Sequence, residues 1–211
     1  MAFKVIFRKN RAHNHFREWL IKALNYPNAD MAVICSGFFQ ENFKGSKFAL
    51  TSDRRFMQAT QNKCIVTVGI HNNMWLPAYR DFRRNFLKNN PGLYALISKR
   101  LKWHAKVFLL FSNGRPCFAI IGSSNMTSSA FGSPGFVKNY NYEADVVIWN
   151  SSIHEVNSYF AETYRDNEDY DRDEISLSYN EKDNFGKTEL DRLNEIQDML
   201  IDAVGDFNFL E

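Results

Sequence analysis

The sequence lacks any long apolar run, and this absence bounds where the protein is expected to work. No window approaches the roughly 18 apolar residues that a membrane-spanning helix needs. Residues 1–8 also lack the apolar stretch of a secretory signal. We therefore expect a cytoplasmic protein that has no membrane partner.

Cysteine is scarce, with only Cys35, Cys64 and Cys117 in the chain. The number is odd, the three residues lie far apart, and each stands in an apolar run. A disulfide framework or a zinc site would need paired or clustered cysteines. The sequence thus predicts reduced cysteines in the core, and it predicts neither a metal site nor a cofactor.

Charge is unevenly spread, although the formal net charge is only +2. Residues 1–150 hold 21 Lys and Arg against 7 Asp and Glu, a balance of +14, whereas residues 151–211 hold 5 against 17, a balance of −12. A basic body attracts polyanions, because neutralised phosphates release counterions. Nucleic acid is the first candidate partner and anionic lipid the second, and an ordinary solvated face is the alternative that assigns no partner.

Short apolar runs that alternate with amphipathic stretches predict an α/β fold. The predicted strands cover residues 31–39, 64–70, 93–98, 103–111, 117–121 and 143–149. The predicted helices cover residues 14–24, 77–88, 128–131, 153–164 and 188–204, with a further helix expected within 44–63. Helix starts and stops are indicated by caps, proline and glycine.

This pattern indicates one domain with an appendage. We expect the body over residues 1–164, an acidic linker over 165–186, and over 187–211 a C-terminal helix that packs on the body or on a dimer partner. Residues 175–179 are compatible with a short strand inside the linker. Thr188 and Asp191 resemble a capping box at the start of the last helix. Whether the acidic end is a lid or a scaffold stays open.

Residues suited to phosphate chemistry follow one another along the chain: His104 and Lys106, then Gly122, Ser123, Ser124 and Asn125, then Glu143. Side chains two apart on a strand point the same way, so His104 and Lys106 are expected to project together. An imidazole can attack phosphorus when an acceptor holds its other nitrogen, and Glu143 would supply that acceptor. Lys106 would balance charge on the phosphate oxygens.

The small residues between them predict a phosphate cradle. Gly122 and Ser123 would let a phosphate approach the backbone closely. The hydroxyls of Ser123 and Ser124 and the amide of Asn125 are donors without a charge of their own. Such a donor set needs no metal.

In this order the residues resemble the phospholipase D superfamily signature, H-x-K followed by G-S-x-N, in the form found in short single-motif nucleases and metal-independent restriction endonucleases. The resemblance implies a phospholipase D-like mixed sheet flanked by helices, extended by the acidic C-terminal helix, with residues 1–164 as the catalytic domain. It implies a phosphohistidine on one histidine, while a second histidine protonates the leaving oxygen and then activates water. It implies His104 as nucleophile or acid, Lys106, Ser123 and Asn125 as phosphate-binding residues and Glu143 as the residue that orients the histidine. We therefore expect His104, Lys106, Asn125 and Glu143 to be catalytic and Gly122, Ser123 and Ser124 to bind the substrate.

The motif occurs once, because no second H-x-K is present. A site shared by two motifs therefore requires a homodimer that brings two copies of His104 together across a two-fold axis. The family also often has an aspartate five residues after the lysine, where this chain has Phe111. The interval from Lys106 to Gly122 is longer than the commonest form, as a lengthened hairpin would explain. The resemblance is specific over about residues 103–149, is weaker at 36–39 and does not cover the acidic end.

Basic side chains outside the motif are candidate contacts to a nucleic-acid backbone. The candidate substrate-binding residues are Arg54, Arg55, Arg83 and Arg84, with Arg80, Lys99, Arg100 and Lys102 beside them and Trp75 and Trp103 available for stacking on unpaired bases. A solvated surface is the alternative for each. Residues 13–15 are interpreted as a helix-capping surface segment and not as an HNH nuclease site, and His71 and His154 as structural residues.

We therefore predict a metal-independent phosphodiesterase, an endonuclease of the restriction or defence type that acts on nucleic acid, with DNA as the first substrate. A phospholipase or phosphatidyltransferase acting on lipid and a catalytically silent nucleic-acid-binding module are the alternatives. A targeting or motor subunit is a further partner that the sequence leaves open. Strand preference and base specificity are also left open.

Overall fold

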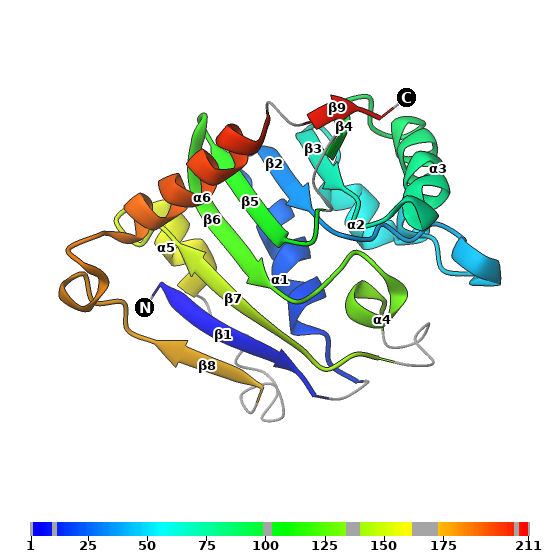
Figure 1. The fold of residues 1–211 in the computed structure, drawn as a ribbon. Helices are drawn as coiled ribbons and strands as arrows, with labels where there is room; N and C mark the ends of the chain where they lie inside the picture. Colours follow the sequence, from blue (N-terminus) through cyan, green and yellow to red (C-terminus); the bar gives the residue numbers. More distant parts are fainter. Residues whose placement is uncertain are drawn as a thin grey trace.

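A nine-stranded mixed sheet is the frame of the protein in the computed structural model (Figure 1). The structure describes residues 2–9, 12–98, 103–133, 140–161, 173–204 and 207–210. The strand order across these residues is β8-β1-β7-β6-β5-β2-β3-β4-β9. The strands are β1 (Phe3–Arg8), β2 (Ala29–Cys35), β3 (Cys64–Gly69), β4 (Leu93–Ser98), β5 (Lys106–Ser112), β6 (Arg115–Gly122), β7 (Glu143–Trp149), β8 (Glu174–Leu177) and β9 (Phe207–Phe209). The helices are α1 (His15–Leu24), α2 (Arg54–Ala59), α3 (Leu76–Leu87), α4 (Ser128–Phe131), α5 (His154–Ala161) and α6 (Glu189–Val204).

Strand direction brings several strand ends to one edge of the sheet. β2, β3 and β4 are parallel, whereas β5 pairs antiparallel with β2 and β6, and β6 pairs antiparallel with β7. β2, β3 and β6 therefore end where β5 and β7 begin, and this end of the strands is termed the site edge. Lys106 lies opposite Gly122, and Gly122 lies opposite Asp145. At the other edge the β5–β6 hairpin turns through Asn113 and Gly114, which both have positive φ.

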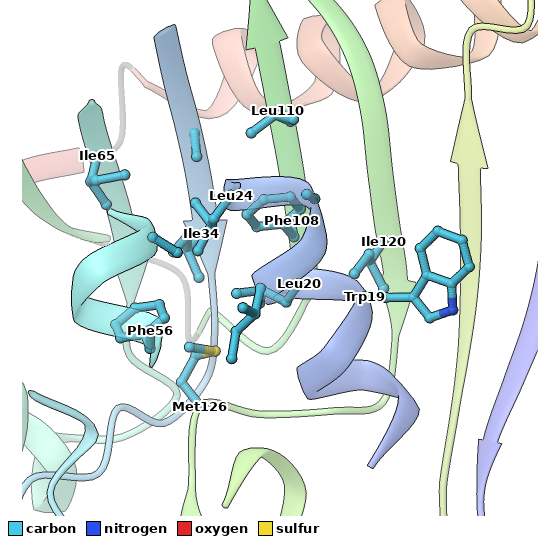
Figure 2. Packing of buried hydrophobic residues seen from close by; sticks show 14 of the residues in the cluster. Trp19, Leu20, Leu24, Ile34, Phe56, Ile65, Phe108, Leu110, Ile120 and Met126 are labelled. Atoms are coloured by element: carbon cyan, nitrogen blue, oxygen red, sulfur yellow. The ribbon is translucent and has the colours of Figure 1, made fainter. Parts of the chain in front are cut away.

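One face of the sheet carries the larger core. Trp19 and Leu20 of α1 pack against Ile34, Phe108 and Ile120 of the central strands (Figure 2). Buried aromatic side chains of α2, α3, α4 and α5 join the same cluster. Burying each large apolar side chain contributes roughly 1.5–3 kcal/mol, so this face holds most of the stability that the sheet gains from packing.

Helix α6 covers the other face, in front of the sheet in Figure 1. Its Leu193 and Leu200 are buried with Leu109 and Phe111 in a second, smaller cluster. The predicted capping box is confirmed, because the Asp191 N–H donates to Thr188 Oγ1 at 3.1 Å and the Thr188 N–H donates to Asp191 at 2.8 Å. The acidic helix thus packs on the sheet of its own chain.

Part of the segment expected to be a linker is instead an edge strand. Strand β8 pairs with β1, and Lys4 forms an ion pair with Glu174 at 2.8 Å. Strand β9 pairs with β4 and is the outermost strand on the other side of the sheet from β8. Pairing at an edge satisfies backbone groups that a linker leaves to water. Residues 165–172 of the expected linker lie outside the described residues.

Residues 13–15 cap α1, as predicted, but they are not a surface segment. Asn14 Oδ1 accepts a hydrogen bond from the Arg17 N–H at 3.1 Å. Asn14 and His15 are buried, and His15 Nδ1 lies 3.2 Å from a carboxylate oxygen of Glu174. Glu174 of β8 contacts His15, and Asn14 Nδ2 donates to the Ala130 carbonyl at 2.9 Å, and local sequence indicates neither contact.

The cysteines are free, with Cys35 and Cys117 buried and Cys64 half-buried. In the part of the chain that the structure describes, no three His, Cys, Asp or Glu side chains come together as metal ligands. None of the described helices has the length and apolar character to cross a bilayer.

Candidate active site

The residues of the predicted site converge at the site edge from three strands. Lys106 is the first residue of β5, Gly122 the last of β6 and Glu143 the first of β7. The segment 123–125 continues from β6. Antiparallel pairing is what joins them, because it places the start of one strand beside the end of the next.

His104 and Lys106 are in contact, although not as neighbours on one face of a strand. The strand expected over 103–111 begins only at Lys106, so His104 lies in the preceding segment. Lys106 Nζ donates to the His104 carbonyl oxygen at 2.6 Å and lies 3.2 Å from both nitrogens of the His104 ring. The segment before β5 therefore places the His104 imidazole against the Lys106 ammonium.

The surroundings favour an uncharged ring at His104. Burial lowers the pKa of His104, and repulsion by the charged Lys106 and by the protonated form of His71 lowers it further. Burial also lowers the pKa of Lys106, whereas Glu143 opposes that change. Lys106 is only 9% exposed, so its charge acts where little water screens it.

Glu143 is held by Ser123 and not by His104. The Ser123 hydroxyl donates to the Glu143 carboxylate and accepts from the Ala144 N–H at 3.1 Å. No hydrogen bond joins Glu143 to His104 within the described ranges. The predicted orientation of His104 by Glu143 therefore has no contact to support it within a single chain.

Ser124 turns into the protein, contrary to its predicted place in a phosphate cradle. Its hydroxyl donates to Asp145 at 2.6 Å and its N–H donates to Asp145 at 3.1 Å. Burial raises the pKa of Asp145 to about 6, although the two bonds from Ser124 oppose this shift. Sequence reasoning missed Asp145, for which an acidic residue in an otherwise apolar strand was the signal.

Gly122 also serves the fold and not a phosphate. A Cβ at this position would lie 2.1 Å from Asp145 Oδ1 and 2.6 Å from the Ala144 carbonyl oxygen. Real Cβ contacts are never so short, so the glycine permits the close packing of β6 on β7. Ser124, Gly122 and Asp145 together form a buried support beneath the site edge.

Asn125 keeps its amide donors available for a ligand. Its Oδ1 accepts from Ser36 Oγ at 3.3 Å, whereas no residue in the described ranges accepts a bond from Nδ2. Ser36 also accepts the Met126 N–H at 3.1 Å. The end of β2 therefore fixes the segment after β6 and leaves the two Nδ2 protons of Asn125 free to bind an oxygen.

His71, which was interpreted as structural, lies beside His104. The two ring centres are 4.5 Å apart, and the ring planes are inclined by 61°. A Cβ at Gly37 would lie 3.3 Å from His71 Cβ and 3.4 Å from Asn125 Oδ1. The absence of a side chain at Gly37 thus gives these groups room, and no motif in the sequence marks their meeting.

The four arginines predicted to bind substrate lie on α2 and α3 and not on the strands of the site edge: Arg54, Arg55, Arg83 and Arg84. Arg55 pairs with Glu18 at 2.7 Å, and Arg84 pairs with Asp81 at 2.5 Å. These pairs hold both guanidinium groups on the protein. The basic residues 99–102 lie outside the described residues.

The two candidate stacking tryptophans differ in their surroundings. Trp103 is 9% exposed and its Nε1 donates to the Ala105 carbonyl at 2.9 Å, so it is a core residue. Trp75 stacks on Phe43 with ring centres 3.9 Å apart. The ring centres of Trp75 and Phe38 are 4.8 Å apart. Phe38 in turn contacts His71 at 5.9 Å. A row of aromatic rings thus leads from the start of α3 to His71, and it consists of Trp75, Phe43 and Phe38.

Phe111, where the phospholipase D pattern often has aspartate, lies far from the site. It is 3% exposed, pairs with Pro116 beside the hairpin turn, and belongs to the second core cluster. At a rise of ~3.4 Å per residue, it is roughly 17 Å along β5 from Lys106. The substitution therefore removes no group from the site edge.

A family model described as NgoFVII restriction endonuclease N-terminal PLD domain matches residues 27–177. The chain belongs to this family. The match covers more than half of the chain and includes His71, His104, Lys106, Asn125 and Glu143. It confirms the resemblance to the phospholipase D superfamily and makes the chain an enzyme domain of the phosphodiesterase class.

Solved structures of low identity resemble the fold. NucT from Helicobacter pylori is 14% identical over 83% of this chain and 99% of that chain, with a TM-score of 0.43. Phosphatidylserine synthase from Haemophilus influenzae Rd KW20 is 12% identical over 97% of this chain and 47% of its own, with a TM-score of 0.47. Yeast tyrosyl-DNA phosphodiesterase is 10% identical over 72% of this chain and 47% of its own, with a TM-score of 0.44. The chain thus spans about half of the last two, and no curated protein matches it.

Proposed function

We propose that this domain is a DNA endonuclease of the restriction type that cleaves phosphodiesters through a phosphohistidine. The observation that supports it most is the contact of His104 with Lys106 at the site edge, where Asn125 follows β6, in a chain from a restriction endonuclease family. A nucleophile, a fixed cation and an amide donor are what attack at phosphorus requires. The balance of +14 over residues 1–150 favours nucleic acid over lipid.

His104 is the proposed nucleophile. A ring nitrogen attacks phosphorus, the N–P bond forms, and the P–O bond to the leaving nucleoside breaks while the leaving oxygen takes a proton from a second, protonated histidine. That histidine, now neutral, takes a proton from water, whose oxygen attacks phosphorus and releases His104. The lowered pKa of His104 supports this role, because the attacking ring must be unprotonated.

Lys106 and Asn125 are proposed to hold the non-bridging oxygens. Lys106 offers a poorly screened charge, and Asn125 offers two N–H groups on Nδ2. Ser123 is exposed and remains a phosphate-binding candidate, with its hydroxyl shared with Glu143. Gly122 and Ser124 are not proposed to bind the phosphate. Asp145 packs directly against Gly122 and accepts the hydrogen bond of the Ser124 hydroxyl.

The second motif histidine is proposed to come from a second copy of the chain. A groove of about 530 Å³ opens beside Lys106 and Gly122, and its lining is mainly apolar. Within it, Ile121 is 38% exposed and Met199 47% exposed. A two-fold contact across this groove would bury both side chains and bring two site edges together. Glu143 of one copy would then be placed to accept from the His104 ring of the other.

The reaction is tested by incubating the protein with labelled duplex DNA, single-stranded DNA, RNA and phosphatidylcholine vesicles in EDTA. We expect duplex DNA cleavage that survives EDTA and falls at least about a thousandfold in His104→Ala. His154→Ala is the matched control. His154 is exposed and follows the end of β7 that is far from the site edge. This control is expected to cleave like the wild type.

Each other outcome has a definite meaning. Loss of cleavage in EDTA contradicts the metal-free mechanism, and turnover of vesicles alone assigns the site to lipid. Equal DNA binding by wild type and His104→Ala, without cleavage, makes the domain a silent binding module. Cleavage of RNA alone moves the substrate from DNA to RNA.

The dimer is tested by light scattering at micromolar concentration. We expect a dimer for the wild type and an inactive monomer for Met199→Glu, because the charge would be buried in the apolar contact. Phe209→Asp, which changes an exposed side chain on β9, is the control. A wild type that is monomeric and fully active contradicts the shared site.

Sequence targeting is proposed to come from outside this domain, from another segment or from a targeting or motor subunit. The matching family model describes an N-terminal domain, which supports this division. The chain alone should then cleave DNA without base preference. Sequencing of the product ends checks this, and a fixed recognition sequence in those ends contradicts it.

A further inference from the structure

His71 has no part in the reaction above, yet its ring lies against that of His104, with centres 4.5 Å apart. The two residues come from different parts of the sheet, since His71 follows β3 and His104 precedes β5, with β2 between those strands. The His71 N–H donates to the Gly37 carbonyl at 2.9 Å. The backbone of His71 is thus tied to the segment after β2, and its ring is placed at the site.

The two nitrogens of the His71 ring have different surroundings. Nδ1 is buried and has no hydrogen-bond partner among the described residues. A proton on Nδ1 would bury an N–H without an acceptor, which costs about 1–3 kcal/mol. The neutral ring therefore carries its proton on Nε2, which is not among the buried unpartnered atoms. No hydrogen bond from this Nε2–H occurs among the described residues, so it is available as a donor beside His104.

We propose that His71 contacts the substrate, with its Nε2–H donating to a non-bridging oxygen of the phosphate that His104 attacks. This proposal rests on the proposed phosphodiesterase function and adds a residue to its site. No proton is transferred. The hydrogen bond strengthens as charge grows on that oxygen during formation of the N–P bond.

A neutral donor suits this position because Lys106 already supplies a cation at 3.2 Å from the His104 ring. A second cation in contact with the ring would draw electron density from the attacking nitrogen. An imidazole with its proton on Nε2 instead binds the oxygen and adds no charge. The phosphate would then be held by three groups, Lys106, Asn125 and His71.

A packing role is the rival explanation, since the His71 ring also meets Phe38 edge to face at 5.9 Å. Two kinds of variant separate the roles. His71→Phe keeps a flat ring against Phe38 but has no donor, whereas His71→Asn and His71→Gln lose the ring and keep a neutral N–H donor. His154→Asn is the matched control for replacing a histidine by an amide.

The first measurement is single-turnover cleavage of duplex DNA at saturating enzyme, with thermal melts to show that each variant folds. We expect His71→Phe to lower the maximal rate about 10- to 100-fold, as loss of one hydrogen bond to a charged oxygen predicts, with little change in half-saturation. The Gln or Asn variant should recover most of the rate. A His71→Phe variant as fast as wild type, or amide variants as slow as His71→Phe, overturns the proposal.

The second measurement does not depend on cleavage. Nitrogen-15 spectra of the histidine rings should show the proton of His71 on Nε2, and inorganic phosphate should shift this nitrogen in a saturable way in the wild type and in His104→Ala. A proton on Nδ1, or no response to phosphate, overturns the proposal. If no nucleic acid is cleaved while His71 Nε2 still responds, the endonuclease function fails and the phosphate contact stands.

Discussion

At one end of the β5–β6 hairpin the buried side chains are polar, and at the other end they are apolar. The site edge buries Lys106, Ser124 and Asp145, which are 9%, 2% and 3% exposed. The turn end buries Phe111 and closes through Asn113 and Gly114. The hairpin, together with β7 beside it, thus has a costly polar arrangement at one end and ordinary core packing at the other, which separates the candidate site from the apolar packing.

The largest expected effect is at the turn end. Phe111→Asp removes an aromatic side chain from the second core cluster and buries a carboxylate there, so we expect the free energy of unfolding to fall by about 5 kcal/mol. Urea unfolding measures the loss, with Phe111→Leu as a milder control. Cleavage per folded molecule should be unchanged. A rise in that rate would show that an aspartate here acts at the site.

At the site edge, Gly122→Ala is expected to cost about 3 kcal/mol. The added methyl group meets Asp145 Oδ1 and the Ala144 carbonyl, so β6 and β7 must separate. Unlike Phe111→Asp, this variant should also lose cleavage in its folded fraction, because Ser123 and Asn125 follow directly. Retention of full activity and stability would contradict the close approach.

Asp145 makes stability depend on pH at the site edge. Its pKa in the folded protein, about 6, lies above the ordinary 3.8, so the folded state binds the proton more tightly. This contribution to stability is therefore largest below about pH 4, is lost as pH rises to about 6, and is flat above. We expect Asp145→Asn, which stays neutral, to gain about 2 to 3 kcal/mol relative to wild type between pH 4 and pH 7. Denaturant unfolding at both pH values tests it, and a constant difference would contradict the shift.

The smallest effect belongs to the turn itself. Gly114 has φ of +70°, so Gly114→Ala should cost about 1 kcal/mol through backbone strain. Asn113→Gly, at φ of 52°, is the control and should cost less. Thermal melts detect the difference, while cleavage should stay at the wild-type rate. A loss of cleavage would show that the two ends of the hairpin are coupled.

Local patterns were enough for most elements. The Asn14 cap, the capping box at Thr188, and strands β3, β4 and β7 lie where the sequence predicts them, within a residue at their ends. Each depends on neighbours within a few residues, which the sequence displays directly. Strand β8 was predicted only as a possibility, because an edge strand depends on a partner, here β1, that lies far away in the chain.

For the candidate site, too, the sequence predicted the features that depend on residue type and missed those that depend on distant strands. The order of His104, Lys106, Asn125 and Glu143 identified the superfamily and the phosphodiesterase class, since reactive groups are properties of residue types. The sequence did not show that the Ser124 side chain points inward or that the packing of β6 on β7 requires a glycine at position 122. Both depend on Asp145 of the neighbouring strand, which accepts from Ser124 and packs against Gly122. The start of β5 at Lys106 was misjudged by three residues, since side-chain pattern alone does not show where pairing with β6 begins.

By itself, the sequence determined the phospholipase D superfamily, the α/β class and the single copy of the motif, because these follow from residue types and their local spacing. Only the tertiary structure decided that Ser124 bonds to Asp145 inside the protein, that Phe111 lies in the second core cluster, and that His71 lies beside His104. Those placements follow from the pairing and packing of strands distant in sequence, where one residue of register decides which side chains meet.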